Sequence, residues 1–200
     1  SEGASLMIEN GETESAKKYC DVIVGETEKM NTLVLQLLEL SMYESGNVVL
    51  KDETFDISAL TDDYADANSI KTSVKGITFT NKIPENTRVV GDRVKTEMII
   101  NNYISNAVSH ADGEKQIVVS STDLGDRYRI SVFNTGKPIA DEDIDKIWIA
   151  FYRADKSRSR SEGRYGLGLS IVSAIQRLYG LDYGVINHEN GVEFWFDIKK

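Results

Sequence analysis

The chain changes pattern at Ser45-Gly46-Asn47, and this change divides it into two kinds of structure. Residues 15–44, before the break, predict one long helix whose second half carries apolar residues at the 3-4-3 spacing of a helical bundle, at Met30, Leu33, Leu37 and Leu40. Gly46 is a typical residue at a helix C-terminus, and beyond it short strand patterns alternate with helix patterns. We therefore expect a helical segment over residues 1–46 and a separate α+β domain over residues 47–200.

The apolar face of the long helix is wider than a two-stranded coiled coil requires, because Val34, Leu35 and Leu38 adjoin the seam. A four-helix arrangement buries such a face better. Residues 1–10 read as the end of another helix, and two helices from one chain cannot complete a bundle of four. We therefore expect a homodimer through residues 1–46; the alternative is that the long helix packs on its own α+β domain.

Beyond the break, the alternation of strand and helix periods predicts an α+β fold, a two-layer sandwich with a mixed sheet that carries helices on one face. Helices are expected over 58–73, with Ser58 as N-cap, and over 93–110, 144–151 and 169–179. Strands are expected over 48–50, 54–57, 77–81, 87–90, 116–121, 128–134, 183–186 and 192–198.

Composition excludes several classes of protein. A net charge of −9 argues against a nucleic-acid partner, because phosphates would be repelled on average. No apolar run approaches the roughly 20 residues of a membrane span, and no signal peptide precedes the fold. The single cysteine, Cys20, excludes an internal disulfide and is consistent with a reducing compartment. The chain begins at Ser1 without Met, so we expect it to be a fragment of a longer protein.

The predicted helix over residues 93–110 carries two asparagines four positions apart, Asn102 and Asn106. On a helical wheel these two and Ser109 fall within about 60° of one another, opposite an apolar face. Asn propagates helices weakly, so folding alone does not explain the pair. Met98 and Ile99 adjoin the row, which favours a pocket wall over a solvated polar face, the alternative. Carboxamide oxygens suit Mg²⁺, which often shares its remaining sites with phosphates.

Two glycine turns add weaker signals for an anion site. Residues 163–170, Gly-Arg-Tyr-Gly-Leu-Gly-Leu-Ser, lead directly into a helix, where backbone N–H groups and the helix dipole favour phosphate. The spacing matches neither Walker A nor the dinucleotide fingerprint, and a plain N-capping turn is the alternative. Residues 134–139, Asn-Thr-Gly-Lys-Pro-Ile, place a carboxamide at a strand end. Between the turns, residues 153–164 hold five basic and two acidic residues, which suggests a particular anion unless the loop is merely solvated.

Taken in order, these motifs resemble the N, G1, F and G2 boxes of the sensor histidine kinases. The matching residues are Asn-x-x-x-Asn-Ala from Asn102, Asn-Thr-Gly-x-x-Ile from Asn134, Phe151-Tyr-Arg, and Gly-x-x-Gly-Leu-Gly-Leu from Gly163. The resemblance covers nearly the whole chain, and within the family it is strongest to VanS-like sensor kinases of Gram-positive bacteria. It implies a Bergerat-type ATP-binding catalytic domain over residues 47–200, preceded by part of a dimerisation and phosphoacceptor hairpin over residues 1–46.

The resemblance also implies roles for individual residues. Asn106 would bind Mg²⁺, supported by Asn102, and His110 stands where the family has an aromatic ring near adenine. Asn134 replaces an Asp that accepts from the adenine amino group, which loses charge assistance on the order of 1 kcal/mol. Ser109 stands where a Lys is frequent, so cations of the loop would contact the phosphates, and Arg153 would stabilise the transferring phosphoryl group. The other implied nucleotide-binding residues are Gly136, Lys156, Arg158, Arg160, Arg164, Gly166, Leu167, Gly168 and Leu169.

Related ATPases such as gyrase, Hsp90 and MutL place a Glu base four residues before the metal-binding Asn. Here that position is Asn102, and a carboxamide cannot take up a proton at neutral pH, so phosphoryl transfer to a protein nucleophile is favoured over hydrolysis. The only histidines are His110 and His188, so we expect the acceptor His upstream of Ser1 and a chain that binds ATP and Mg²⁺ without phosphorylating itself. The alternative is a nucleotide-binding or dimerisation module without catalysis.

The family resemblance implies a response-regulator receiver domain as the partner that accepts the phosphoryl group. It also implies that the chain lies on the cytoplasmic side, and that the full-length protein is anchored in the cell membrane although this stretch contains no membrane segment.

Overall fold

The computed structural model describes residues 13–46, 48–154 and 165–200. It begins with the long helix α2 (Thr13–Glu44), which confirms the helix expected over residues 15–44. The α+β domain follows in the order β1 (Asp52–Asp56), α3 (Ile57–Lys75), β2 (Thr78–Asn81), β3 (Arg88–Asp92), α4 (Arg93–His110), β4 (Gln116–Asp123), β5 (Arg127–Thr135), η1 (Asp141–Asp143), η2 (Lys146–Trp148), α5 (Gly168–Tyr179), β6 (Tyr183–His188) and β7 (Gly191–Lys199). The helix end expected over residues 1–10 lies outside the described residues.

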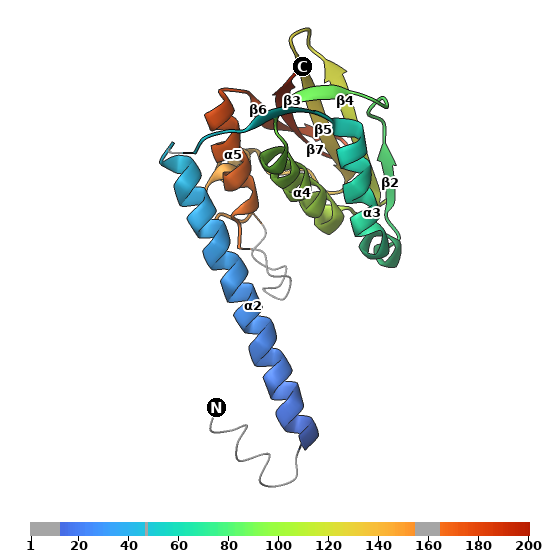
Figure 1. Cartoon of the computed structure of the whole chain (residues 1–200). Helices are drawn as coiled ribbons and strands as arrows, with labels where there is room; N and C mark the ends of the chain where they lie inside the picture. Colours follow the sequence, from blue (N-terminus) through green and yellow to red (C-terminus); the bar gives the residue numbers. More distant parts are fainter. Residues whose placement is uncertain (1–12, 47, 155–164) are drawn as a thin grey trace.

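The domain is a two-layer sandwich of one mixed sheet and three helices, as the sequence predicts (Figure 1). The strand order is β1-β3-β7-β5-β4-β2, and β6 pairs with β7 beside that path. The pairing of β2 with β4 is parallel, whereas β4, β5, β6 and β7 pair antiparallel. Helices α3, α4 and α5 cover one face of the sheet, so the apolar side chains of both layers meet between them.

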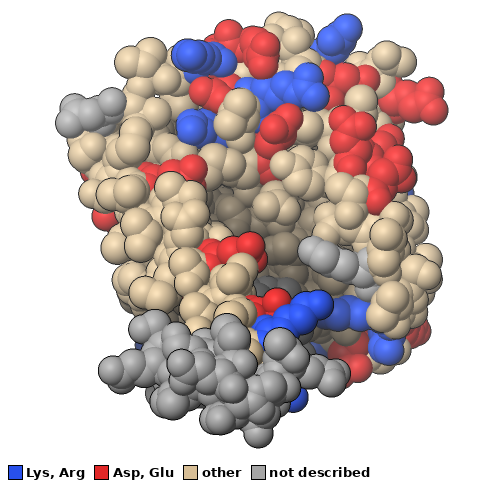
Figure 2. Space-filling view, turned by 60° about the horizontal axis from the view of Figure 1, so that its bottom comes forward, with Lys and Arg blue, Asp and Glu red and all other residues tan. Residues whose placement is uncertain are grey.

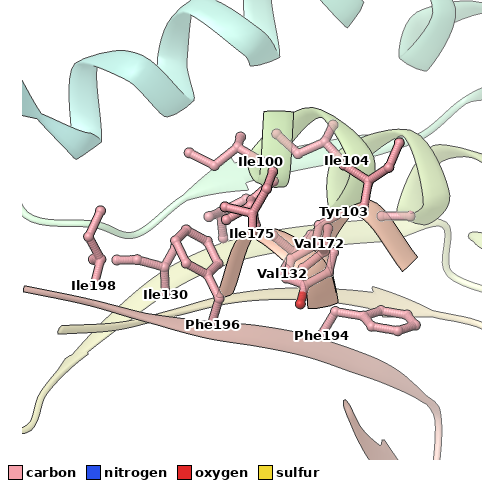
Figure 3. Close-up of a cluster of buried hydrophobic side chains, with 14 of the residues drawn as sticks. Ile100, Tyr103, Ile104, Ile130, Val132, Val172, Ile175, Phe194, Phe196 and Ile198 are labelled. Carbon is pink, nitrogen blue, oxygen red and sulfur yellow. The ribbon is translucent and has the colours of Figure 1, made fainter. Parts of the chain in front are cut away.

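The core lies where α4 and α5 pack on the two longest strands, β5 and β7 (Figure 3). Alternate residues of each strand face the helices, so Ile130 and Val132 are almost fully buried together with Phe196. The hydroxyl of Tyr103, from α4, crosses this layer and donates to the carbonyl of Trp195 (3.1 Å). Its burial raises the pKa of the Tyr103 phenol well above the usual value. This packing fixes α4 against the sheet.

Helix α2 uses its two sides differently. Leu40 and Tyr43 are buried against the domain and Leu33 packs on the same core, mainly through contact of α2 with α5. On a helical wheel these three lie within about 80° of one another. The roughly opposite side exposes large apolar side chains at Met30, Val34, Leu35, Leu37, Leu38 and Met42. The two packing schemes left open by the sequence therefore concern different faces: one face contacts its own domain, and the other is exposed in this single chain.

Four local expectations are wrong. Residues 48–50 are not a strand, because the pairing of β1 with β3 ends at Asp52 and Asp92, where the chain turns into α4. The N-cap of α3 is Asp56 rather than Ser58: its carboxylate accepts from the backbone N–H of Ser58 (2.9 Å), and the Ser58 hydroxyl donates to Ile83 instead. The helix expected over 144–151 is not formed: this range contains the 3-10 turn η2, and the other 3-10 turn, η1, precedes it.

The fourth concerns Ile99, which was expected beside the asparagine row. It is buried, because α5 packs on that side of α4.

Candidate nucleotide site

The site is organised by α4, and the start of this helix is held by several hydrogen bonds. The carboxylate of Asp92 accepts from the backbone N–H groups of Lys95 (3.2 Å) and Lys51 (3.1 Å), which caps the helix and ties down the chain that follows α2. The backbone N–H of Asp92 donates to the hydroxyl of Tyr179 at the end of α5 (2.6 Å). Burial raises the pKa of Tyr179 to about 12. Helix α4 thus starts from a fixed point in the domain.

Asn102 lies half-buried at the contact between α4 and α5. Its Nδ2 donates to the carbonyl of Met98, one turn earlier (2.8 Å), so its Oδ1 faces away from that bond. A Cβ added to Gly168 would lie only 2.4 Å from this Oδ1. The helix that carries the asparagines and the glycine turn that begins α5 are therefore in direct contact, as the motifs predict, and any side chain at position 168 would displace the Asn102 carboxamide.

Asn106 and Ser109 continue the polar row along α4, and both are half-buried rather than sealed in the core. The hydroxyl of Ser109 donates to the carbonyl of Ser105 (2.8 Å). On the opposite side of the helix Ile100, Ile104 and Ala107 are buried, as expected. The predicted division of α4 into a core face and a carboxamide face is confirmed.

The glycine turn is joined to the Phe-Tyr-Arg segment on the other side of the basic loop. The N–H of Phe151 donates to the carbonyl of Gly166 (3.0 Å), and a Cβ at Gly166 would lie 2.8 Å from the carbonyl of Tyr152. The backbone of Gly166 has φ +73°, which favours glycine. Arg153 follows Tyr152 directly in the chain and is half-buried. The other predicted cations, Lys156, Arg158, Arg160 and Arg164, lie outside the described residues.

The start of α5 is suited to an anion. Leu167 precedes its first turn and, in the part of the chain that the structure describes, makes no side-chain capping bond. Backbone N–H groups at such a start point toward whatever lies beyond the helix end, and the helix dipole favours negative charge there. Leu167 itself is buried and Leu169 is half-buried, so these two residues anchor the turn through apolar contacts.

The second glycine turn closes the other end of the asparagine row. Asn134, the last residue but one of β5, is almost fully buried, and its Nδ2 donates to the carbonyl of Thr135 (3.1 Å). Gly136 has φ +151°, and a Cβ there would lie 2.5 Å from the carbonyl of His110, the last residue of α4. The structure thus brings Asn134, Gly136 and His110 together, although His110 itself is exposed.

A hollow lies on this side of the molecule, where α4 ends and α5 begins. Figure 2 shows it bordered mainly by uncharged residues, with acidic and basic side chains around it. A separate pocket of about 270 Å³ lies beside Gly136 and is lined in part by Asp112, Thr135 and Lys137. Side chains alternate along β5, so Thr135 and Asn134 face opposite sides of the strand. We therefore distinguish this pocket from the site at the asparagines.

The donor set fits a magnesium ion that a nucleotide brings with it. Among the described residues no group of three or more His, Cys, Asp or Glu could hold a metal alone. Mg²⁺ accepts one or two protein oxygens when phosphates and water supply the rest, and the Oδ1 of Asn102 takes no part in the bond that Nδ2 makes to Met98. The carboxamides can therefore serve as metal ligands only as part of a nucleotide complex.

Sequence reasoning missed contacts that surround the site. The hydroxyl of Tyr152 donates to Asp143 (2.5 Å), which raises the pKa of that tyrosine and fastens the segment before Arg153. Tyr43 of α2 contacts both Lys95 and Met98 of α4. Both contacts join residues whose relation depends on the fold, so no local pattern could have indicated them.

The comparisons with known proteins agree with this geometry. Residues 91–200 match the family described as histidine kinase-, DNA gyrase B-, and HSP90-like ATPases, so the chain belongs to that family. The sensor protein VanSB of Enterococcus faecalis is 30% identical over 193 residues, which cover 96% of this chain and 43% of VanSB. The chain thus spans less than half the length of that relative.

Solved structures give the same result at the level of the fold. Full-length ShkA in complex with AMPPNP superposes with a TM-score of 0.81 at 25% identity, covering 93% of this chain and 39% of ShkA. The histidine kinase ThkA, in complex with the response regulator protein TrrA, superposes with a TM-score of 0.74 at 29% identity, covering 94% of this chain and 52% of ThkA. The resemblance to the catalytic region of sensor histidine kinases, including VanS-like ones, is confirmed.

Proposed function

We propose that this chain is the ATP-binding catalytic region of a two-component sensor histidine kinase. It would transfer the γ-phosphoryl group of ATP to a histidine on a dimerisation helix, for relay to a response-regulator receiver domain. The observation that carries the proposal is the contact of Asn102 with Gly168, because it joins a metal-binding carboxamide to a phosphate-binding helix start. Family membership and the likeness to VanSB support the same reading.

The chemistry of the site favours transfer over hydrolysis. The position of a general base in the related ATPases is occupied by Asn102, whose Nδ2 is already hydrogen bonded within the helix. A carboxamide so held cannot activate water by taking its proton. In this proposal Asn106 and Asn102 hold Mg²⁺, Asn134 and His110 contact adenine, and Arg153 stabilises the charge of the transferring group. Bound Mg²⁺ would neutralise charge on the phosphates.

The exposed apolar face of α2 supports a homodimer as part of the proposal. Side chains such as Leu37 and Leu38 are about half exposed on this face, and a second copy could bury them in a helical bundle. A dimer through residues 1–46 would also bring a catalytic domain near a partner helix. No described helix has both the length and the apolar content that a membrane crossing needs. Anchoring of a full-length protein in the membrane, with this region on the cytoplasmic side, therefore remains a proposal.

A nucleotide-binding or dimerisation module without catalysis is the second candidate. Two observations favour it: Asn134 lacks the charge of an Asp, and the hydroxyl of Ser109 bonds within its own helix where the family often has a lysine. Either change weakens a nucleotide contact without removing the site.

The two functions are separated by supplying the acceptor in trans. The chain is mixed with a helical hairpin that carries a kinase acceptor histidine, together with ATP labelled at the γ-phosphate and Mg²⁺. We expect acid-labile label on the histidine of the hairpin, and none on the chain alone. Binding of ATP without any transfer would favour the non-catalytic module. Label on a histidine of this chain itself would contradict the expectation that it cannot phosphorylate itself.

A further inference from the structure

The junction between α2 and α4 contains polar contacts that the proposed reaction does not use. Tyr43, near the end of α2, is buried, and its hydroxyl donates to the Sδ of Met98 (3.4 Å). The same hydroxyl accepts from Nζ of Lys95 (2.9 Å). Both partners lie on one side of the first two turns of α4. Tyr43 is therefore held at one point by two residues of the helix that carries the asparagines.

Met98 joins this junction to the candidate site. Its side chain accepts from Tyr43, while its backbone carbonyl accepts from Nδ2 of Asn102. Asn102 in turn rests against Gly168. An unbroken series of contacts thus runs from α2, where Tyr43 joins the edge of the core, through one turn of α4 to the start of α5.

Helix α2 also contacts the second wall of the site. It packs along α5, which begins at the glycine turn (Figure 1). The pKa of Lys29 on α2 is raised mainly by its hydrogen bond with Glu26 and in smaller part by Tyr165, a residue of the glycine turn. Helix α2 therefore contacts both α4 and α5, the two helices that meet at Asn102 and Gly168.

We propose that Tyr43, Lys95 and Met98 form a latch that links the docking of α2 to nucleotide binding, with Tyr43 as a positioning residue for Asn102. Asn102 would hold a cation through Oδ1, and the polarised carboxamide would then make its Nδ2 a stronger donor to the carbonyl of Met98. The turn that holds Tyr43 is then more rigid, and docking of α2 costs less conformational entropy. Because coupling is reciprocal, docking of α2 must strengthen nucleotide binding by the same factor. The inference rests on the proposed function, and it adds a regulatory input from α2.

The native cysteine provides a direct measurement of docking. Cys20 is exposed on α2 and lies 23 residues before Tyr43, which corresponds to about 35 Å of helix. A small rotation at the latch therefore moves Cys20 a long way. A second cysteine at the exposed turn between β2 and β3, introduced as Glu85→Cys, completes a pair for spin labels. Labelled chains diluted with unlabelled Cys20→Ser chains report distances within one molecule.

We expect a non-hydrolysable ATP analogue with Mg²⁺ to narrow the distance distribution between positions 20 and 85. Tyr43→Phe, which keeps the ring and removes both hydroxyl bonds, should broaden the distribution and weaken analogue binding about fivefold, a coupling of ordinary size. Met98→Leu removes only the sulfur acceptor and should change both readouts less. Tyr128→Phe is the matched control, because that half-buried ring also has a lysine over it, Lys200, but lies far from α2 along the sheet.

The outcomes separate the latch from the proposed function. An analogue that binds with Mg²⁺ but leaves the distances unchanged, together with equal affinities for Tyr43→Phe and Tyr128→Phe, would overturn the latch and leave the nucleotide site intact. Absence of nucleotide binding in the unmodified chain would overturn both. A broader distribution in Tyr43→Phe with unaltered affinity would also contradict the proposal, because a merely structural contact would give that result.

Discussion

Helices α2 and α4 each carry a face that the fold of the single chain does not need, and the two faces differ in chemistry. The spare face of α4 presents half-buried carboxamides beside a glycine turn, whereas that of α2 presents exposed aliphatic side chains. Oriented polar groups suit a small charged ligand, and an aliphatic surface suits another protein helix. The comparison is the basis for assigning the proposed nucleotide site to α4 and the proposed homodimer contact to α2.

The difference between the faces of α2 can be tested first, and it should give the largest effect. Leu40 is buried against the domain, so Leu40→Ala should lower the free energy of unfolding by about 2–5 kcal/mol through lost contacts and a cavity. Leu37, 45% exposed, should lose less than about 1 kcal/mol in the same substitution when the chain is monomeric. Urea unfolding monitored at low protein concentration measures both.

We expect the opposite ranking of Leu37→Ala and Leu40→Ala when self-association is measured in place of the free energy of unfolding. If the exposed face binds a second copy, Leu37→Ala weakens self-association in sedimentation experiments more than it lowers stability. Equal effects of Leu40→Ala and Leu37→Ala on stability would show that the two faces are not distinct.

The polar face of α4 is tested by filling the contact beside it. Gly168→Ala places a methyl group 2.4 Å from Oδ1 of Asn102 and must displace this carboxamide, so nucleotide affinity should fall at least about tenfold, or about 1.4 kcal/mol. The matched control is Gly25→Ala on α2, where a Cβ would meet nothing within 4 Å. Calorimetric titration with an ATP analogue measures the loss. An unchanged affinity in Gly168→Ala would mean that the turn is only a helix start.

Asn134 tests the adenine end of the same site. Asn134→Asp supplies a charged acceptor, so affinity for adenine nucleotides should rise about fivefold, or about 1 kcal/mol. The new carboxylate is buried and loses the bond to Thr135, so the thermal midpoint of the ligand-free chain should fall. Comparison of ATP with GTP in the same titration is decisive, because a gain for both nucleotides alike would contradict an adenine contact.

The smallest effect concerns how α4 is fastened at its start. The pKa of Tyr179 is about 12 in the folded chain against about 10 for an ordinary tyrosine. The folded state holds this proton more tightly, so its contribution to stability is complete below pH 10 and is lost as the pH rises toward 12. Tyr179→Phe should therefore reduce the fall in unfolding free energy between pH 9 and 11. Tyr19→Phe, on an exposed position of α2, should leave that fall unchanged.

The sequence predicts α4 and the position of its carboxamide face well because the relevant signals are local. The apolar period gives both ends of the helix and its core face, and the asparagine pair and glycine turns are contiguous motifs. That the asparagine pair lies next to the glycine turns was expected from the family resemblance and not from the spacing of the motifs alone. The sandwich and most strands were likewise predictable from alternating patterns.

The features that the sequence did not predict depend on contacts between residues far apart along the chain. Residues 144–151 contain the 3-10 turn η2 instead of a helix. Trp148 in this turn packs edge-on against Tyr183 of β6 and Phe194 of β7 (4.9 and 6.1 Å between ring centroids). The burial of Ile99 depends on where α5 packs, and a helical wheel cannot give that position. The latch at Tyr43 joins residues 55 positions apart. In each case tertiary packing overrides a local preference.

The account depends most on a magnesium nucleotide bound by the carboxamides of α4. Its most direct test is calorimetric titration of ATP into the chain with and without Mg²⁺, comparing the wild type with Asn106→Ala and with Asn101→Ala, an exposed asparagine of the same helix. We predict that Mg²⁺ strengthens ATP binding in the wild type and in Asn101→Ala, and that Asn106→Ala loses this gain while it still binds the nucleotide weakly. An undiminished gain from Mg²⁺ in Asn106→Ala would contradict the metal assignment.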